Sequence, residues 1–95
     1  MAGVALSRRA VKDLRRIGPG EELSRIREAL EGLEGYRTDL DLKSLRGQSP
    51  WLRLRVGDYR VLYRPIASGE AGNASHLVAR IVHRSDLQRA VATLA

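Results

Sequence analysis

Residues 51–65, WLRLRVGDYRVLYRP, carry four arginines at short intervals: Arg53, Arg55, Arg60 and Arg64. A guanidinium group stays charged at physiological pH and binds phosphate or carboxylate through two parallel hydrogen bonds. Arginines gathered on one surface therefore supply the chemistry of an anion site, whereas arginines spread over a solvated sheet only keep it in solution. The direction in which these side chains point decides between the two.

The segment has the pattern of a β-hairpin. Residues 52–56 alternate apolar and charged side chains, which predicts a half-buried strand, and Gly57-Asp58 is typical of a two-residue turn. A return strand then covers residues 59–64, and Pro65 closes it. Because side chains alternate between the two faces of a strand, the turn determines how every residue faces, and one residue of slip would reverse it.

If Gly57-Asp58 is the whole turn, one face of the hairpin is apolar and the other is basic. The apolar face collects the pairs Val56–Tyr59, Leu54–Val61 and Leu52–Tyr63. The basic face collects Arg55 opposite Arg60, Arg53 opposite Leu62, and Trp51 opposite Arg64. Like charges directly opposite each other destabilise a hairpin, and no acid of the hairpin lies on this face. A solvated outer face is the alternative interpretation, but the lack of mixed charge favours a phosphate site.

The composition also fits an anionic partner. The chain has a formal net charge of +6, and 15 of its 17 basic residues are arginine, which attracts nucleic acid, acidic proteins or anionic membrane surfaces. Without cysteine there is no disulfide, thiolate metal site or cysteine nucleophile, and the two histidines lack zinc-site spacing, so we expect neither a metal nor a small-molecule cofactor. The sequence shows no membrane span or signal peptide, so we expect a cytoplasmic protein that is not bound to a membrane.

The other elements must position the hairpin. Residues 4–6 form a short apolar run that predicts a first strand. A helix is expected over residues 7–17, with Ser7 as its N-cap and Gly18-Pro19 as its end, and a second helix over residues 21–34. Each helix has one apolar stripe, so we expect a helical hairpin docked on the apolar face of the strands.

The second half of the chain completes a mixed architecture. Its remaining segments are a connector over residues 36–50, a flexible loop over 67–75, a central strand over 77–82 covered on both faces, and a C-terminal helix over 85–94 capped by Ser85. The expected order is β-α-α-β-β-β-α, in a single α+β domain that spans residues 1–95.

Three further candidate residues end the central strand and begin the turn after it, in RIVHRSD: Arg80, His83 and Arg84. The arginines extend the basic character of the hairpin. An imidazole titrates near neutral pH, so His83 is a candidate general acid or base, with a turn histidine of no catalytic role as the alternative.

With LKSLRG, then WLRLRVGDYRVLYRP, then IVHRSDL before a C-terminal helix, the chain resembles the RelE/ParE superfamily of bacterial toxins over essentially its whole length. The resemblance implies the RelE fold, which is similar to microbial ribonucleases: a twisted antiparallel sheet with a helical hairpin packed on one face. RelE-type members, which this chain resembles most, cut messenger RNA in the ribosomal A site without a metal. In that reaction the RNA 2′-hydroxyl attacks its own phosphate and leaves a 2′,3′-cyclic phosphate.

The resemblance also implies roles for individual residues. Arg60 matches the phosphate-stabilising arginine, Arg84 a second charge-stabilising or proton-donating arginine, and Arg53 a catalytic lysine or arginine. Contacts to RNA are expected from Arg55, Arg64, Trp51, Arg80 and Gln88. Many members carry a tyrosine where this chain has Gln88, which only forms hydrogen bonds. Proton transfer would then fall to His83, an arginine or ribosomal RNA, and a positioned acid or base contributes about 10²–10⁴-fold.

The resemblance implies macromolecular partners. We expect a cognate antitoxin protein, messenger RNA in the ribosomal A site, and ribosomal RNA. The alternatives are a ParE-like inhibitor of DNA gyrase, which would not cut RNA, and a relative that has lost toxicity and only binds its antitoxin.

Overall fold

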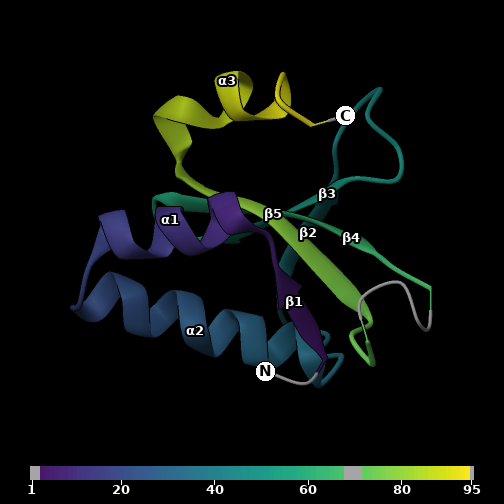
Figure 1. Cartoon of the computed structure of the whole chain (residues 1–95), viewed down its shortest axis with the longest axis horizontal. Helices are drawn as coiled ribbons and strands as arrows, with labels where there is room; N and C mark the ends of the chain where they lie inside the picture. The colour runs from purple at the N-terminus through teal and green to yellow at the C-terminus, as the bar shows by residue number, and fades with distance from the viewer. Residues whose placement is uncertain (1–2, 68–71, 95) are drawn as a thin grey trace.

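The computed structural model describes residues 3–67 and 72–94. In chain order the elements are β1 (Val4–Leu6), α1 (Arg8–Ile17), α2 (Glu21–Glu34), β2 (Asp41–Ser44), β3 (Leu52–Val56), β4 (Tyr59–Pro65), β5 (His76–His83), a 3₁₀ turn (Arg84–Asp86) and α3 (Leu87–Val91). The five strands form one sheet in the order β1-β5-β4-β3-β2. Figure 1 shows α1 and α2 together on one side of the sheet and α3 on the other, which confirms the predicted α+β class and helical hairpin.

Two features of the sheet differ from the prediction. Residues 41–44, expected within a connector, form the edge strand β2, which pairs antiparallel with β3. All four of its residues are exposed, so no buried face marks them in the sequence. The strand β1 runs parallel to β5, whereas the other three pairings are antiparallel as expected. Residues 68–71 of the predicted loop lie outside the described residues.

The main core lies between the sheet and the helical hairpin. The predicted hairpin register is confirmed at all three apolar pairs, Val56–Tyr59, Leu54–Val61 and Leu52–Tyr63. Leu54 and Val61 are fully buried against Ile26 and Leu30 of α2. Helix α1 begins as expected, because the Ser7 hydroxyl accepts a hydrogen bond from the backbone of Ala10 at 3.0 Å.

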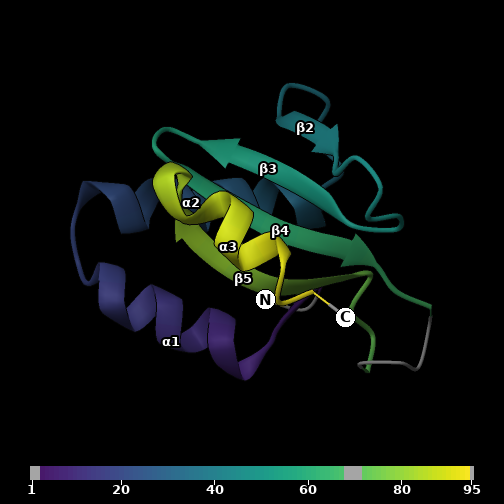
Figure 2. The same cartoon turned by 90° about the horizontal axis from the view of Figure 1, so that it is seen from above.

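A smaller core lies on the opposite face, where α3 crosses over β4 and β5 of the twisted sheet (Figure 2). Leu62 and Val82 are buried there beneath Ala90. The predicted helical cap is wrong: Ser85 lies within the 3₁₀ turn, and its backbone N–H donates to Nδ1 of His83 at 3.2 Å. A 3₁₀ turn before the helix takes the place of a side-chain cap.

Helix α1 closes the outer edge of β5 beyond the point where β1 ends. Asp13 of α1 accepts hydrogen bonds from the backbone N–H of Ile81 at 2.8 Å and from Nε of Arg80 at 3.0 Å. Asp13 is only 6% exposed, so these are buried contacts. An open strand edge presents unpaired backbone groups, and Asp13 satisfies one of them. No helix within the described ranges is long and apolar enough to cross a membrane.

We predict that Asp13→Ala lowers the free energy of unfolding by about 3–5 kcal/mol, because it leaves the Arg80 guanidinium buried without its counter-ion. Urea unfolding followed by circular dichroism measures the change. Glu21→Ala is the control, since it breaks the exposed Arg25–Glu21 pair and costs less than about 1 kcal/mol. Equal losses in the two variants would contradict the role given to Asp13.

Candidate nucleic-acid interface

Four arginines converge on the sheet face opposite the helical hairpin. In the observed register Arg55 lies opposite Arg60, and Arg53 opposite Leu62, as predicted. Arg84 starts the 3₁₀ turn after β5, and its backbone N–H donates to the carbonyl of Asp58 at 2.7 Å, which ties it to the β3–β4 turn. We call Arg53, Arg55, Arg60 and Arg84 the arginine cluster.

The middle of the cluster is Arg60. Partial burial lowers the pKa of its guanidinium, and the positive charges of Arg55, Arg53 and Arg84 lower it further. Its Nη1 donates to the carbonyls of Gly57 at 2.9 Å and Tyr59 at 3.0 Å. The side chain is therefore held in place by the turn while it stays under repulsion from its neighbours, and a bound anion would relieve that repulsion.

Two carboxylates border the cluster. Asp41 of β2 accepts a hydrogen bond from Nη1 of Arg53 at 3.1 Å and lies 4.0 Å from Nη1 of Arg55. Asp58 lies 3.6 Å from Nε of Arg84, and both of these side chains are exposed. Four guanidinium groups against two carboxylates leave an excess of two positive charges. The cluster is thus partly compensated and remains suited to a phosphate.

Asp41 is a residue that the sequence interpretation missed. No acid of the hairpin lies on the basic face, but the neighbouring strand β2 supplies one directly opposite Arg55. The available signal was weak, since Asp41-Leu42-Lys43 alternates charged and apolar residues over too short a span to predict a strand.

Trp51 and Arg64 form a pair at the far end of the hairpin. The guanidinium carbon of Arg64 lies 5.7 Å from the centre of the Trp51 ring, within the range of a cation–π contact. The pair extends the basic face with an aromatic surface, and bases of single-stranded RNA stack on such surfaces.

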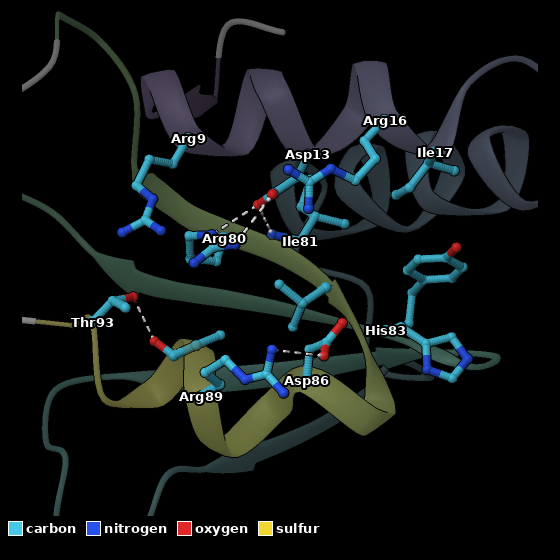
Figure 3. A pocket seen from close by; sticks show the side chains of 13 residues that line it. Arg9, Asp13, Arg16, Ile17, Arg80, Ile81, His83, Asp86, Arg89 and Thr93 are labelled. Carbon is cyan, nitrogen blue, oxygen red and sulfur yellow. Dashed lines mark hydrogen bonds and ion pairs between the residues drawn. The ribbon is translucent and has the colours of Figure 1, made fainter.

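Arg80 and His83 are predicted site residues that are not brought to the cluster. The guanidinium of Arg80 is bound to Asp13 and its side chain is only 14% exposed (Figure 3). His83 pairs with Tyr59, so its ring lies on the face opposite Arg60, where it meets the Tyr59 ring edge-on at 5.7 Å. Gln88 is exposed on α3. An RNA contact through Arg80 and an acid–base role for His83 at Arg60 do not agree with this geometry.

Nothing in the described ranges resembles a metal centre, because no three histidine, aspartate or glutamate side chains gather there. Arg53, Arg55, Arg60 and Arg84 are themselves cationic, which suits an anionic ligand better than a metal ion.

Comparisons with known proteins fit this geometry. The sequence model described as "ParE toxin of type II toxin-antitoxin system, parDE" matches residues 4–88. The fold is similar to the RelB-RelE antitoxin-toxin complex from Methanococcus jannaschii, with 25% identity, a TM-score of 0.69, and coverage of 90% of this chain and 96% of that one. It is also similar to the archaeal RelE-RelB complex from Pyrococcus horikoshii OT3, with 25% identity, a TM-score of 0.63, and coverage of 86% and 93%. No curated protein sequence matches the chain.

We predict that Asp41→Asn strengthens binding of a single-stranded RNA oligonucleotide, because the carboxylate competes with phosphate for Arg53. An exposed ion pair contributes about 0.2–1 kcal/mol, so the expected gain is about 1.4- to fivefold in affinity. Fluorescence anisotropy at fixed salt measures it. Glu28→Gln makes the same change in net charge on α2, across the sheet, and should have little effect. Equal gains in both variants would mean that RNA does not bind at the arginine cluster.

Proposed function

The chain belongs to the family of ParE toxins of type II toxin–antitoxin systems, and we propose that this toxin stops growth by cutting messenger RNA in the ribosomal A site. The observation that carries the proposal is the arginine cluster, in which a turn holds Arg60 among three other guanidinium groups. The likeness to RelE proteins in solved antitoxin–toxin complexes also supports this proposal. Action on ribosomes would place the toxin in the cytoplasm.

The cluster suits the charge that develops during RNA cleavage. The 2′-hydroxyl oxygen attacks the adjacent phosphorus, the bond to the 5′-oxygen breaks, and a 2′,3′-cyclic phosphate and a 5′-hydroxyl result. The phosphorane between these states carries more negative charge than the starting diester. Fixed cations aimed at that charge stabilise it more than they stabilise the bound substrate, which lowers the barrier. We assign this role to Arg60 and Arg84, with Arg53 and Arg55 beside them.

Proton transfer is the step for which the chain offers the fewest suitable side chains. A proton must leave the 2′-hydroxyl and another must reach the 5′-oxygen. His83 faces away from Arg60, and Gln88 cannot titrate. We therefore assign the transfer to an arginine of the cluster or to ribosomal RNA, and we expect little activity on free RNA. If ribosomal RNA transfers the protons while the toxin stabilises the charge, the ribosome forms part of the active site.

An antitoxin is the expected protein partner. The family belongs to two-component toxin–antitoxin systems, and the two solved relatives are complexes of an antitoxin with its toxin. A chain of net charge +6 would be matched by an acidic partner.

We predict that Arg60→Ala and Arg84→Ala each remove A-site cuts and growth inhibition while the fold is kept. Loss of one donor to a developing charge costs about 10²–10³ in rate. Primer extension on translating ribosomes detects the cuts, and thermal unfolding checks the fold. Arg27→Ala on the exposed surface of α2 is the matched control and should cut normally. Intact messenger RNA at a toxic dose of the unaltered protein would overturn the proposal.

A second candidate, inhibition of DNA gyrase, is favoured by the match to the ParE family and by the absence of a titratable histidine beside Arg60 in the described structure. Under the first proposal we expect purified toxin to leave gyrase supercoiling unaffected at doses that arrest translation. Inhibited supercoiling with intact messenger RNA would establish the second candidate instead. A protein that does neither, and whose induction leaves growth unchanged, would be a non-toxic antitoxin-binding relative.

A further inference from the structure

A groove that the arginine cluster does not reach lies at the outer edge of the sheet. It has a volume of about 350 Å³ and runs between α1, the outer edge of β5 and α3 (Figure 3). We call it the α1–α3 groove. None of the four arginines of the cluster lines it. Small-molecule sites have volumes of about 300–1,000 Å³, so the groove is large enough for a small ligand of its own.

The rim of the α1–α3 groove carries three exposed arginines. Arg9 and Arg16 stand seven residues apart, so they lie on the same side of α1, and Figure 3 shows both reaching over the groove. No carboxylate of the described residues lies within ion-pair distance of either one. On the facing helix α3, Nη1 of Arg89 lies 4.0 Å from Oδ1 of Asp86, at the limit of an ion pair. Three guanidinium groups thus surround one opening.

The charges at the inner side of the groove are already paired. Oδ2 of Asp13 accepts a hydrogen bond from Nε of Arg80 at 3.0 Å, and Oδ1 accepts one from Nη2 at 3.3 Å. The Asp13 carboxylate is buried with its partner, so it does not neutralise the rim. Four arginines and two aspartates line the groove in all, which leaves an excess of two positive charges.

The interior between these charges is apolar. Ile17, Ile81 and Ala90 contribute aliphatic surface to it. At the end that Figure 3 shows with His83, the rings of Tyr59 and His83 meet edge-on with their centres 5.7 Å apart. The groove therefore combines an aliphatic interior, an aromatic end and a cationic rim.

These properties favour a phosphate monoester attached to a flat ring system, which is the chemistry of a mononucleotide. A phosphate monoester carries about −1.5 to −2 charge at pH 7 and offers three acceptor oxygens, which matches the excess charge and the three guanidinium groups of the rim. A nucleobase packs its flat faces on apolar side chains and stacks on aromatic rings. A phosphodiester inside an RNA strand carries a single negative charge, so it matches the excess charge of the groove less well.

We propose that the α1–α3 groove binds a free mononucleotide, with its phosphate on Arg9, Arg16 and Arg89 and its base on the apolar interior beside Tyr59 and His83. The ligand then bridges α1 and α3, because both helices supply arginines to one phosphate. Binding there uses no residue of the arginine cluster and no step of RNA cleavage. Either proposal can therefore fail while the other holds.

The test is an NMR titration of the ¹⁵N-labelled full chain with AMP. We expect shifts at the backbone amides of Asp13, Ile81 and Ala90, and none of comparable size at Gly57 or Arg60. Adenosine, which lacks the phosphate, should bind at least about tenfold more weakly than AMP, because it makes no charge-assisted hydrogen bonds to the rim. Ribose 5-phosphate, which lacks the base, should also lose about tenfold, because nothing packs on the apolar interior.

Two matched variants of α1 locate the phosphate. Arg9→Gln/Arg16→Gln removes two arginines of the rim and should weaken AMP binding at least about tenfold. Arg8→Gln/Arg15→Gln is the control, because it has the same helix, the same seven-residue spacing and the same change in net charge, and neither residue lines the groove. It should change the dissociation constant of AMP by less than about threefold, since exposed charges at a distance are screened by salt.

Four results would overturn the proposal. Equal losses in the two α1 variants would mean that net charge alone attracts AMP. Absent shifts, or shifts at Gly57 and Arg60 in place of the groove, would mean that AMP does not bind there. Ribose 5-phosphate that binds as tightly as AMP would reduce the groove to a phosphate patch. Displacement of AMP by a single-stranded RNA oligonucleotide without terminal phosphates would assign the groove to RNA.

Discussion

The turn at Gly57-Asp58 determines the register of β3 against β4, and the arrangement of charged groups depends on that register. Gly57 has a φ of +57°, which glycine adopts without steric cost, so two residues suffice to reverse the chain. The carbonyls of the same turn hold two arginines of the cluster: Gly57 accepts from Arg60, and Asp58 accepts from the backbone of Arg84. A slip of one residue would send Arg60 into the helix-covered core.

The basic face of the hairpin contains a repulsion that lowers the stability of the sheet. Arg55 opposite Arg60 is a repulsive pair that mixed charges would remove, and in the described part of the chain Asp41 lies near Arg55 while Asp58 lies near Arg84. The sheet tolerates this repulsion because its other face is buried against α1 and α2, and because α3 buries Leu62 and Val82 beside the cluster.

Much of the fold could be predicted from local patterns. The helices around Ala10 and Ile26, the hairpin and its register all follow from the spacing of apolar residues, because one face of each element is buried. The strand β2 and the parallel pairing of β1 could not be predicted. An exposed edge strand has no buried face to create a pattern, and the neighbour of a three-residue strand is chosen by the path of the whole chain. For a similar reason Ser85 resembled a cap but became part of a 3₁₀ turn.

The sequence by itself determined which residues share the basic face of the hairpin, because alternation along a strand is a local property: Arg53, Arg55 and Arg60 followed from it. Only the tertiary structure decided what lies next to that face. It turned Arg84 toward the hairpin, supplied Asp41 from a neighbouring strand, and directed Arg80 to Asp13 and His83 to the opposite side. These contacts join residues distant in sequence, and their partners depend on how strands and helices pack, which no local spacing encodes.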